Sequence, residues 1–192
     1  MLPRANSYQA LINQFKWQVP QRYNIAWDIC DKWIEKDGRT ALVYETTDGI
    51  QKRYTFKDIH LLSNQLANVF SAFGLQRLDR IAILLPQRPE VGVTHLASYR
   101  SGAIAVPLFT LFGQDALRYR LRDSGAKFVV TDSVGVNSIA AIRHELPDLQ
   151  VVFNVEGDGD GVEDFYGLLQ RASDSFESVQ TMADDPAMII YT

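Results

Sequence analysis

The stretch RIAILLPQRPEVGVTHLASYRSGAIAVPLF, residues 80–109, decides the fold class of this chain. It begins and ends with a short apolar run, and neither run alternates with polar residues, as expected for strands buried on both faces of a sheet. Between them, Pro89 suits the first turn of a helix and Gly102 its end. A strand, a helix and a second strand in this order predict a parallel pair joined by a crossover helix.

The pattern continues to the C-terminus, where helix-like segments alternate with short runs rich in β-branched residues. Helices are expected over 114–125, 137–146 and 163–173, and strands over 126–132, 149–155 and 187–192. This alternation predicts an α/β fold, a doubly wound and largely parallel sheet with helices on both faces. Ligands of such sheets bind at the carboxyl ends of the strands.

Before residue 80 the periodicity predicts a helix and a β-hairpin. Apolar residues recur at helical spacing over 22–36. Alternating residues over 40–56 surround Asp48-Gly49, a strong signal for a short turn. Thr55 is then expected to cap a long helix over 56–74, with an aspartate three residues later as a weaker form of the capping box.

Composition restricts the class of protein and its partners. Of 192 residues, 46% are apolar and 22% are charged, and the formal net charge is −4, which gives no electrostatic case for binding nucleic acid. The single cysteine, Cys30, excludes an internal disulfide framework and a Cys-based zinc cluster, so a cytoplasmic setting fits best. The apolar run 81–85 is far below the ~20 residues of a membrane span, so no span is expected.

Several local signals have simple structural explanations. In GDGDG (157–161), Asp158 and Asp160 match the first positions of a calcium loop, but the later ligand positions do not follow, so a solvated turn is expected. The histidines stand on predicted helices without partners at metal-ligand spacing, so no metal ligand is predicted; they are His60, His95 and His144. The motifs G-x-S-x-G and G-x-G-x-x-G are absent, so the hydrolase and dinucleotide-binding classes lack their signature.

Three arginines lie on the predicted helix 114–125. Arg118 and Arg122 are one turn apart and share a face, whereas Arg120 points elsewhere. Solvated helix charge explains them, and the alternative is an anchor for an anionic group such as a phosphate. The residues alone therefore predict a fold and no reaction.

Six segments resemble, in order and spacing, the first part of the AMP-binding domain of adenylate-forming enzymes. They are YNIAWDICDKW (23–33), YTFKDI (54–59), RIAILLPQRPE (80–90), ASYRSGAIAVPLF (97–109), FGQDALRYRLRDSGAKFVVTD (112–132) and DDPAMIIYT (184–192). Within that superfamily, the first segment and PLFTLFGQDALRYRL (107–121) are most similar to the acetyl- and medium-chain acyl-CoA synthetases. The resemblance covers nearly the whole chain.

The resemblance implies an ATP-dependent carboxylic acid–CoA ligase. Such an enzyme joins the acid to AMP with release of pyrophosphate, and the thiol of coenzyme A then displaces AMP to give the acyl-CoA. The implied substrates are a carboxylic acid, ATP and coenzyme A, with Mg²⁺ to neutralise the phosphates. The family binds the phosphates partly with a Thr-Ser-Gly-rich loop that ends in Pro-Lys-Gly.

Two residues receive a role through the resemblance. In the family the phosphate loop follows a strand that resembles AMIIYT (187–192), and Thr192 matches the first residue of that loop, an ATP-binding position. Arg120 lies where the acetyl-CoA synthetase branch has an arginine near the nucleotide end of coenzyme A, at a position where that branch varies. No residue of the chain matches a catalytic position or a metal ligand.

The expected organisation is an N-terminal extension, 1–21, and then the N-terminal part of an AMP-binding domain, 22–192, truncated at the start of the phosphate loop. We expect a fragment of an acyl-CoA synthetase that is inactive alone and poorly soluble, because the strand over 187–192 lacks neighbours. The alternative is a stand-alone α/β binding module without catalysis. The residues present define neither the acyl chain length nor the oligomeric state.

Overall fold

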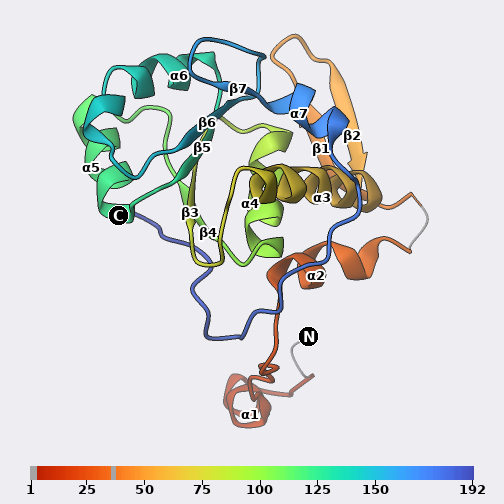
Figure 1. Cartoon of the computed structure of the whole chain (residues 1–192). Helices are drawn as coiled ribbons and strands as arrows, with labels where there is room; N and C mark the ends of the chain where they lie inside the picture. Colours follow the sequence, from red (N-terminus) through yellow and green to blue (C-terminus); the bar gives the residue numbers. More distant parts are fainter. Residues whose placement is uncertain (1–3, 36–37) are drawn as a thin grey trace.

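The computed structural model of the chain describes residues 4–35 and 38–192 (Figure 1). Within these ranges five strands form one sheet in the order β4-β3-β5-β6-β7, and each pair of neighbours is parallel. The strands are β3 (Arg80–Leu84), β4 (Ile104–Pro107), β5 (Phe128–Thr131), β6 (Val151–Asn154) and β7 (Glu163–Asp164). The predicted parallel sheet is confirmed. The helix predicted over 163–173 is wrong at its start, because residues 163 and 164 form β7, which extends the sheet by two residues.

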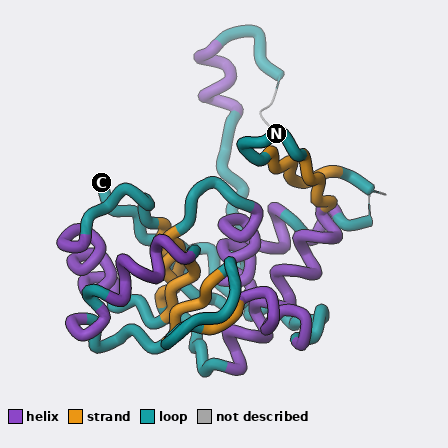
Figure 2. Tube along the Cα trace, turned by 90° about the horizontal axis from the view of Figure 1, so that it is seen from above, coloured by secondary structure: helices purple, strands orange, loops and turns teal. Residues whose placement is uncertain are grey.

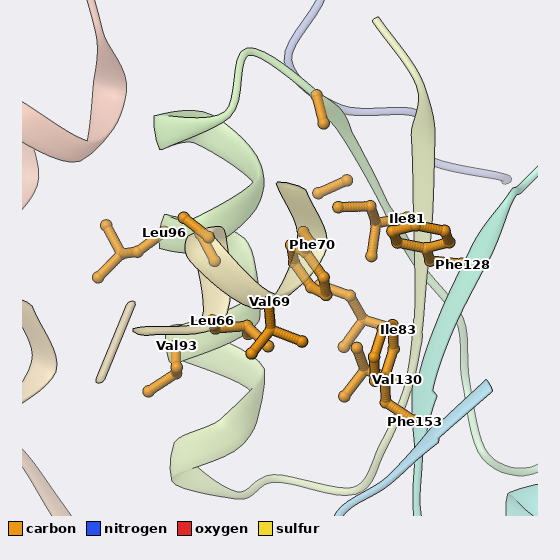
Figure 3. Packing of buried hydrophobic residues seen from close by; sticks show 14 of the residues in the cluster. Leu66, Val69, Phe70, Ile81, Ile83, Val93, Leu96, Phe128, Val130 and Phe153 are labelled. Atoms are coloured by element: carbon orange, nitrogen blue, oxygen red, sulfur yellow. The ribbon is translucent and has the colours of Figure 1, made fainter. Parts of the chain in front are cut away.

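Helices cover both faces of this sheet (Figures 1 and 2). One layer holds α3 (Phe56–Ala72), α4 (Pro89–Arg100) and α7 (Phe165–Arg171), and the other holds α5 (Gln114–Ser124) and α6 (Ser133–Ala140). Ile81 and Ile83 of β3 pack in the first layer, whereas Ala82 and Leu84 pack in the second, because successive side chains of a strand point to opposite faces. Figure 3 shows Phe70 of α3 pointing towards the sheet within the first layer. The doubly wound α/β fold is confirmed.

The chain reverses direction across the sheet at β3. From β3 it passes through α4 in the first layer to β4 on one side. From β4 it passes through α5 in the second layer to β5, on the other side of β3. Loops that leave neighbouring strands towards opposite faces open a crevice at the carboxyl edge, where ligands of such sheets bind.

The predicted hairpin precedes the sheet. Strands β1 (Thr40–Glu45) and β2 (Gln51–Thr55) pair antiparallel. Thr55 then caps α3 with a complete capping box, because its Oγ1 accepts from the Asp58 backbone N–H at 3.1 Å and the Asp58 carboxylate accepts from the Thr55 backbone N–H at 2.8 Å. Figures 1 and 2 show α1 (Tyr8–Gln14) apart from the body, and none of its residues, all of which the structure describes, is buried.

The helix predicted over 22–36 is wrong in its extent. The structure has α2 (Ile25–Ile29), an irregular Cys30 with φ −127° and ψ −62°, and a 3₁₀ turn η1 (Asp31–Trp33). The break turns Asp31 towards Arg100 of α4, with which it forms a buried ion pair. The predicted end of the helix at residue 36 lies outside the described residues.

The helix predicted over 137–146 begins earlier and ends earlier. Helix α6 starts at Ser133, because the side chain of Asp132 accepts a hydrogen bond from the Gly135 backbone N–H at 2.9 Å and caps the helix. It ends at Ala140 and is followed by the 3₁₀ turn η2 (Arg143–Glu145).

The strand predicted over 187–192 is reduced to a single bridge. Met188 pairs parallel with Ala105 of β4. The Ala105 N–H donates to the Ala187 carbonyl, and the Ile189 N–H donates to the Ala105 carbonyl, each at 3.0 Å. The segment is extended and runs parallel to the other strands. Within the described chain it pairs only with β4, and this pairing does not extend into a longer strand.

Candidate functional site

The candidate site lies at the carboxyl edge of the sheet beside β4. The loop that follows β4 and the end of the extended segment 187–191 meet there, because that segment runs parallel to β4. Figure 1 shows the C-terminus next to α5. The fold therefore brings residues of α5 and the last residues of the chain together.

Arg120 of α5 lies between two aromatic rings at this edge. Its Cζ is 4.1 Å from the ring centroid of Phe112 and 5.5 Å from that of Tyr191. Its Nη1 donates to the carbonyl of Ala116 at 3.0 Å, and its Nε is buried without a hydrogen-bond partner among the described residues. A guanidinium over aromatic faces is stabilised by cation–π attraction and keeps donors for an anion.

The other two arginines of the helix differ from Arg120. Arg118 pairs with Asp115 at 2.6 Å and with Glu145 at 3.3 Å, so these two carboxylates compensate its charge. Arg122 is exposed. Arg120 is partly buried and forms no ion pair with a carboxylate in residues 4–35 and 38–192. Its charge is therefore uncompensated within this part of the chain.

Tyr191 connects the last residues of the chain to α5. Its hydroxyl donates to Oδ2 of Asp123 at 2.7 Å and lies 3.2 Å from the carbonyl of Arg120. Its ring meets that of Tyr119 edge to face, with the centroids 6.3 Å apart. Burial and the hydrogen bond to Asp123 raise the pKa of Tyr191 to about 12, so the hydroxyl stays a donor at neutral pH.

Thr192, the other residue named from the sequence, is exposed at the end of the chain. The structure brings Thr192 and Arg120 to one edge of the sheet through Tyr191, which precedes Thr192 and contacts Arg120. Among the contacts of the described residues, none joins the side chains of Thr192 and Arg120 directly. The two residues are therefore neighbours in position and not partners.

A second polar cluster, at the carboxyl edge, could not be predicted from the sequence. Glu90, in the first turn of α4, is only 5% exposed and accepts a hydrogen bond from the Tyr166 hydroxyl at 2.5 Å. Arg88 lies 3.3 Å from Glu90 and 3.0 Å from Glu156, which follows β6. Burial and the Glu90 carboxylate raise the pKa of Tyr166 well above its usual range. No local pattern reveals this cluster, because Tyr166 lies 76 residues from Glu90.

The histidines take structural positions. His60 Nδ1 lies 2.8 Å from the carboxylate of Asp31, His95 Nδ1 lies 3.1 Å from the Tyr99 hydroxyl, and His144 is exposed. In the part of the chain that the structure describes, no group of three His, Cys, Asp or Glu side chains could hold a metal ion.

A groove of about 1240 Å³ opens elsewhere, between residues 14–28 and 178–183. Asn24, one of its lining residues, donates to the carbonyl of Tyr99, near the end of α4. That helix end precedes β4, so the groove lies at the amino edge of the sheet. Because ligands of doubly wound sheets bind at the carboxyl edge, we place the candidate site beside Arg120 and not in this larger groove.

No helix among the described residues combines the length and apolar character needed to cross a bilayer.

Comparisons with known proteins relate this chain to one enzyme family. Residues 31–192 match the AMP-binding enzyme family. The mouse (Mus musculus) mitochondrial acyl-coenzyme A synthetase ACSM3 is 31% identical over 197 residues, which cover 97% of this chain and 34% of the relative. The human (Homo sapiens) ACSM4, also named as mitochondrial, is 33% identical over 190 residues, which cover 94% of this chain and 33% of the relative.

Solved structures show the same relationship. An acyl-CoA synthetase of Brucella canis superposes with a TM-score of 0.88 at 29% identity, over 98% of this chain and 36% of that one. A fatty acyl CoA synthetase of Mycobacterium tuberculosis superposes with a TM-score of 0.75 at 26% identity, over 88% of this chain and 32% of that one. The chain thus spans about a third of the length of the relatives it matches.

Proposed function

Because the chain belongs to the AMP-binding enzyme family, we propose that it forms the N-terminal part of an ATP-dependent carboxylic acid–CoA ligase. The reaction converts an acid, ATP and coenzyme A to acyl-CoA, AMP and pyrophosphate through an acyl-AMP. The observation that carries the proposal is the match over residues 31–192 together with the parallel segment that delivers Thr192 to the carboxyl edge of the sheet.

The proposed organisation is an extension over residues 1–21 followed by the first part of the AMP-binding domain over 22–192. Two observations support it. All residues of helix α1 are within the described range, and none of them is buried. The family match begins at residue 31, beyond the extension.

We assign binding roles to two residues. Thr192 would be the first residue of the loop that binds the phosphates of ATP. Arg120 would bind a phosphate at the nucleotide end of coenzyme A, since its guanidinium has no carboxylate partner within the described residues and lies at the same edge as Thr192. A guanidinium binds phosphate with charge-assisted hydrogen bonds. We assign no catalytic residue.

Magnesium would accompany ATP as a substrate complex and neutralise its phosphates. The described residues do not fit a Mg²⁺ site of their own, because none of their acidic side chains forms a cluster of the required kind. The roles proposed for Arg120 and Thr192 therefore involve no metal ligand of this part of the chain.

A cytoplasmic location also stays a proposal, supported by the single cysteine, Cys30. The curated relatives are named as mitochondrial proteins, which is said of them alone. Fractionation of the source cells followed by immunodetection of the chain decides between the two compartments.

The 192-residue polypeptide by itself is expected to show no turnover, since it covers about a third of its relatives. The test is pyrophosphate release from ATP and Mg²⁺ with a panel of short- and medium-chain acids. Acid-dependent release by this polypeptide would overturn that expectation. Sequencing the transcript past codon 192 tests whether the chain is part of a ligase. A reading frame that continues into a Ser-Gly-Thr-rich loop supports the ligase, and a stop codon supports a stand-alone binding module.

A further inference from the structure

The last extended segment of the chain depends on a side chain for its attachment near Thr192. Its backbone hydrogen bonds to β4 end with Ile189, whose N–H donates to the Ala105 carbonyl. Beyond that point, within the described residues, the Tyr191 hydroxyl makes the attachment by donating to Asp123 at 2.7 Å. Tyr191 therefore fixes the direction in which the chain reaches Thr192.

The same tyrosine forms one side of the environment of Arg120. The guanidinium lies between the rings of Phe112 and Tyr191, which come from the loop after β4 and from the final segment. Its Nη1 is anchored on the Ala116 carbonyl. Removal of Tyr191 would open one face of the guanidinium and free it to turn.

Asp123 is the natural competitor for this guanidinium. It lies three residues after Arg120 on α5, a spacing at which an arginine and a carboxylate pair readily on a helix surface. Arg118 pairs with Asp115 at the same separation, at 2.6 Å, although there the acid precedes the arginine. Asp123 instead accepts the hydrogen bond of Tyr191, and it forms no ion pair with Arg120 in the described structure.

We propose that Tyr191 is a positioning residue that holds the Asp123 carboxylate away from the Arg120 guanidinium and so leaves this arginine available to a phosphate group. The nature of the ligand, a nucleotide phosphate of coenzyme A, rests on the proposed function. The positioning itself does not, because it follows from the contacts of Tyr191 alone. One side chain thereby links the arginine to the residue that begins the phosphate loop.

The protonation state of Tyr191 agrees with this role. Its hydroxyl remains a donor at neutral pH, because burial and the Asp123 hydrogen bond raise its pKa to about 12. The charged or titratable groups that contact Tyr191 are Asp123, Arg120 and Tyr119. At neutral pH the hydroxyl therefore engages Asp123 as a donor.

The test uses the 192-residue chain and adenosine 3′,5′-bisphosphate, a mimic of the nucleotide end of coenzyme A. In Tyr191→Phe the ring stays over Arg120 but the hydrogen bond to Asp123 is lost, so Asp123 can pair with Arg120. We expect the affinity for the bisphosphate to fall by up to about fivefold, the strength of an exposed ion pair. Adding Asp123→Asn to Tyr191→Phe removes the competing charge, so the double variant should regain the original affinity for the bisphosphate. Arg118→Ala, at an arginine paired elsewhere, is the matched control and should leave the affinity unchanged.

The resonance of the Arg120 Nε–H gives a second readout that needs no ligand. It should shift in Tyr191→Phe and return towards its original position in the double variant. An unchanged resonance, or an affinity that falls equally in the single and the double variant, would overturn the positioning role. If the unmodified chain binds no bisphosphate, the nucleotide role of Arg120 is wrong, and the resonance alone decides whether Tyr191 separates the two charges.

Discussion

Arg100 of α4 and Asp31 of η1 form a bidentate ion pair inside the protein. Nη1 lies 2.8 Å from Oδ2 and Nη2 lies 2.5 Å from Oδ1, and the arginine is only 1% exposed. The Arg100 Nε also donates to the hydroxyl of Ser63 on α3 at 2.9 Å. The pair therefore ties the N-terminal segment to two helices of the first layer.

Removal of Asp31 should destabilise the fold strongly. Asp31→Ala leaves the Arg100 charge buried without a counter-ion, and such changes cost about 3–5 kcal/mol. The double variant Asp31→Leu/Arg100→Met should lose less than the sum of the single variants, because no isolated charge remains. Urea denaturation measures the three free energies of unfolding, and strict additivity would contradict the coupling.

The same pair makes stability depend on acid pH. Burial by itself would raise the pKa of Asp31, but hydrogen bonds from Arg100 and His60 outweigh it, and the net pKa lies below the ordinary 3.8. A lowered folded-state pKa adds stability at pH values above the ordinary one, and this stability is lost as pH falls below about 4. Asp31→Asn should therefore show a shallower loss of stability between pH 5 and about 2 than the unmodified chain. Equal slopes in the two melting series would argue against this.

Gly135 of α6 should not tolerate even an alanine. A Cβ there would lie 1.8 Å from Oγ1 of Thr131, which is fully buried and donates to the Leu84 carbonyl at 2.7 Å. We expect Gly135→Ala to destabilise by about 1–3 kcal/mol, as overpacking of a core does. Gly92 of α4 has open space around its Cβ position, so Gly92→Ala is the matched control. It should be neutral or stabilise by up to about 1 kcal/mol through helix propensity, and a similar loss of stability in both variants would be inconsistent with the clash.

The edge formed by residues 187–191 should promote association of the 192-residue chain. Met188 is 40% exposed and Ile190 is 66% exposed beside the bridge to β4. Exposed apolar edges of this kind favour pairing with other chains, and a charge on them opposes it. Ile190→Lys should therefore reduce aggregation in size-exclusion chromatography and light scattering. A monodisperse, cooperatively melting monomer of the unmodified chain would refute the prediction.

Most of the sheet could be predicted from the sequence because its signals are local. Apolar runs, Pro89 at a helix start and Gly125 at a helix end, where φ is +58°, report the structure of their own neighbourhood. The break at Cys30 could not be predicted, because the ion pair that accompanies it joins Asp31 to Arg100, a residue far along the chain.

The candidate site could be predicted from the sequence only in part. Thr192 and Arg120 could be named from a resemblance, but their common edge depends on the parallel bridge between Met188 and Ala105. The surroundings of Arg120 could not be derived, since Phe112 and Tyr191 approach it from separate segments. Periodicity describes which face a side chain takes and not which distant ring it meets.

Acid-dependent product formation tests most directly whether this chain is part of a carboxylic acid–CoA ligase. The protein encoded by the complete reading frame is incubated with ATP, Mg²⁺, coenzyme A and a panel of short- and medium-chain acids, and AMP, pyrophosphate and acyl-CoA are measured together. We predict that at least one acid yields the three products in equal amounts. A folded protein that binds ATP but forms none of them with any acid would contradict the assignment.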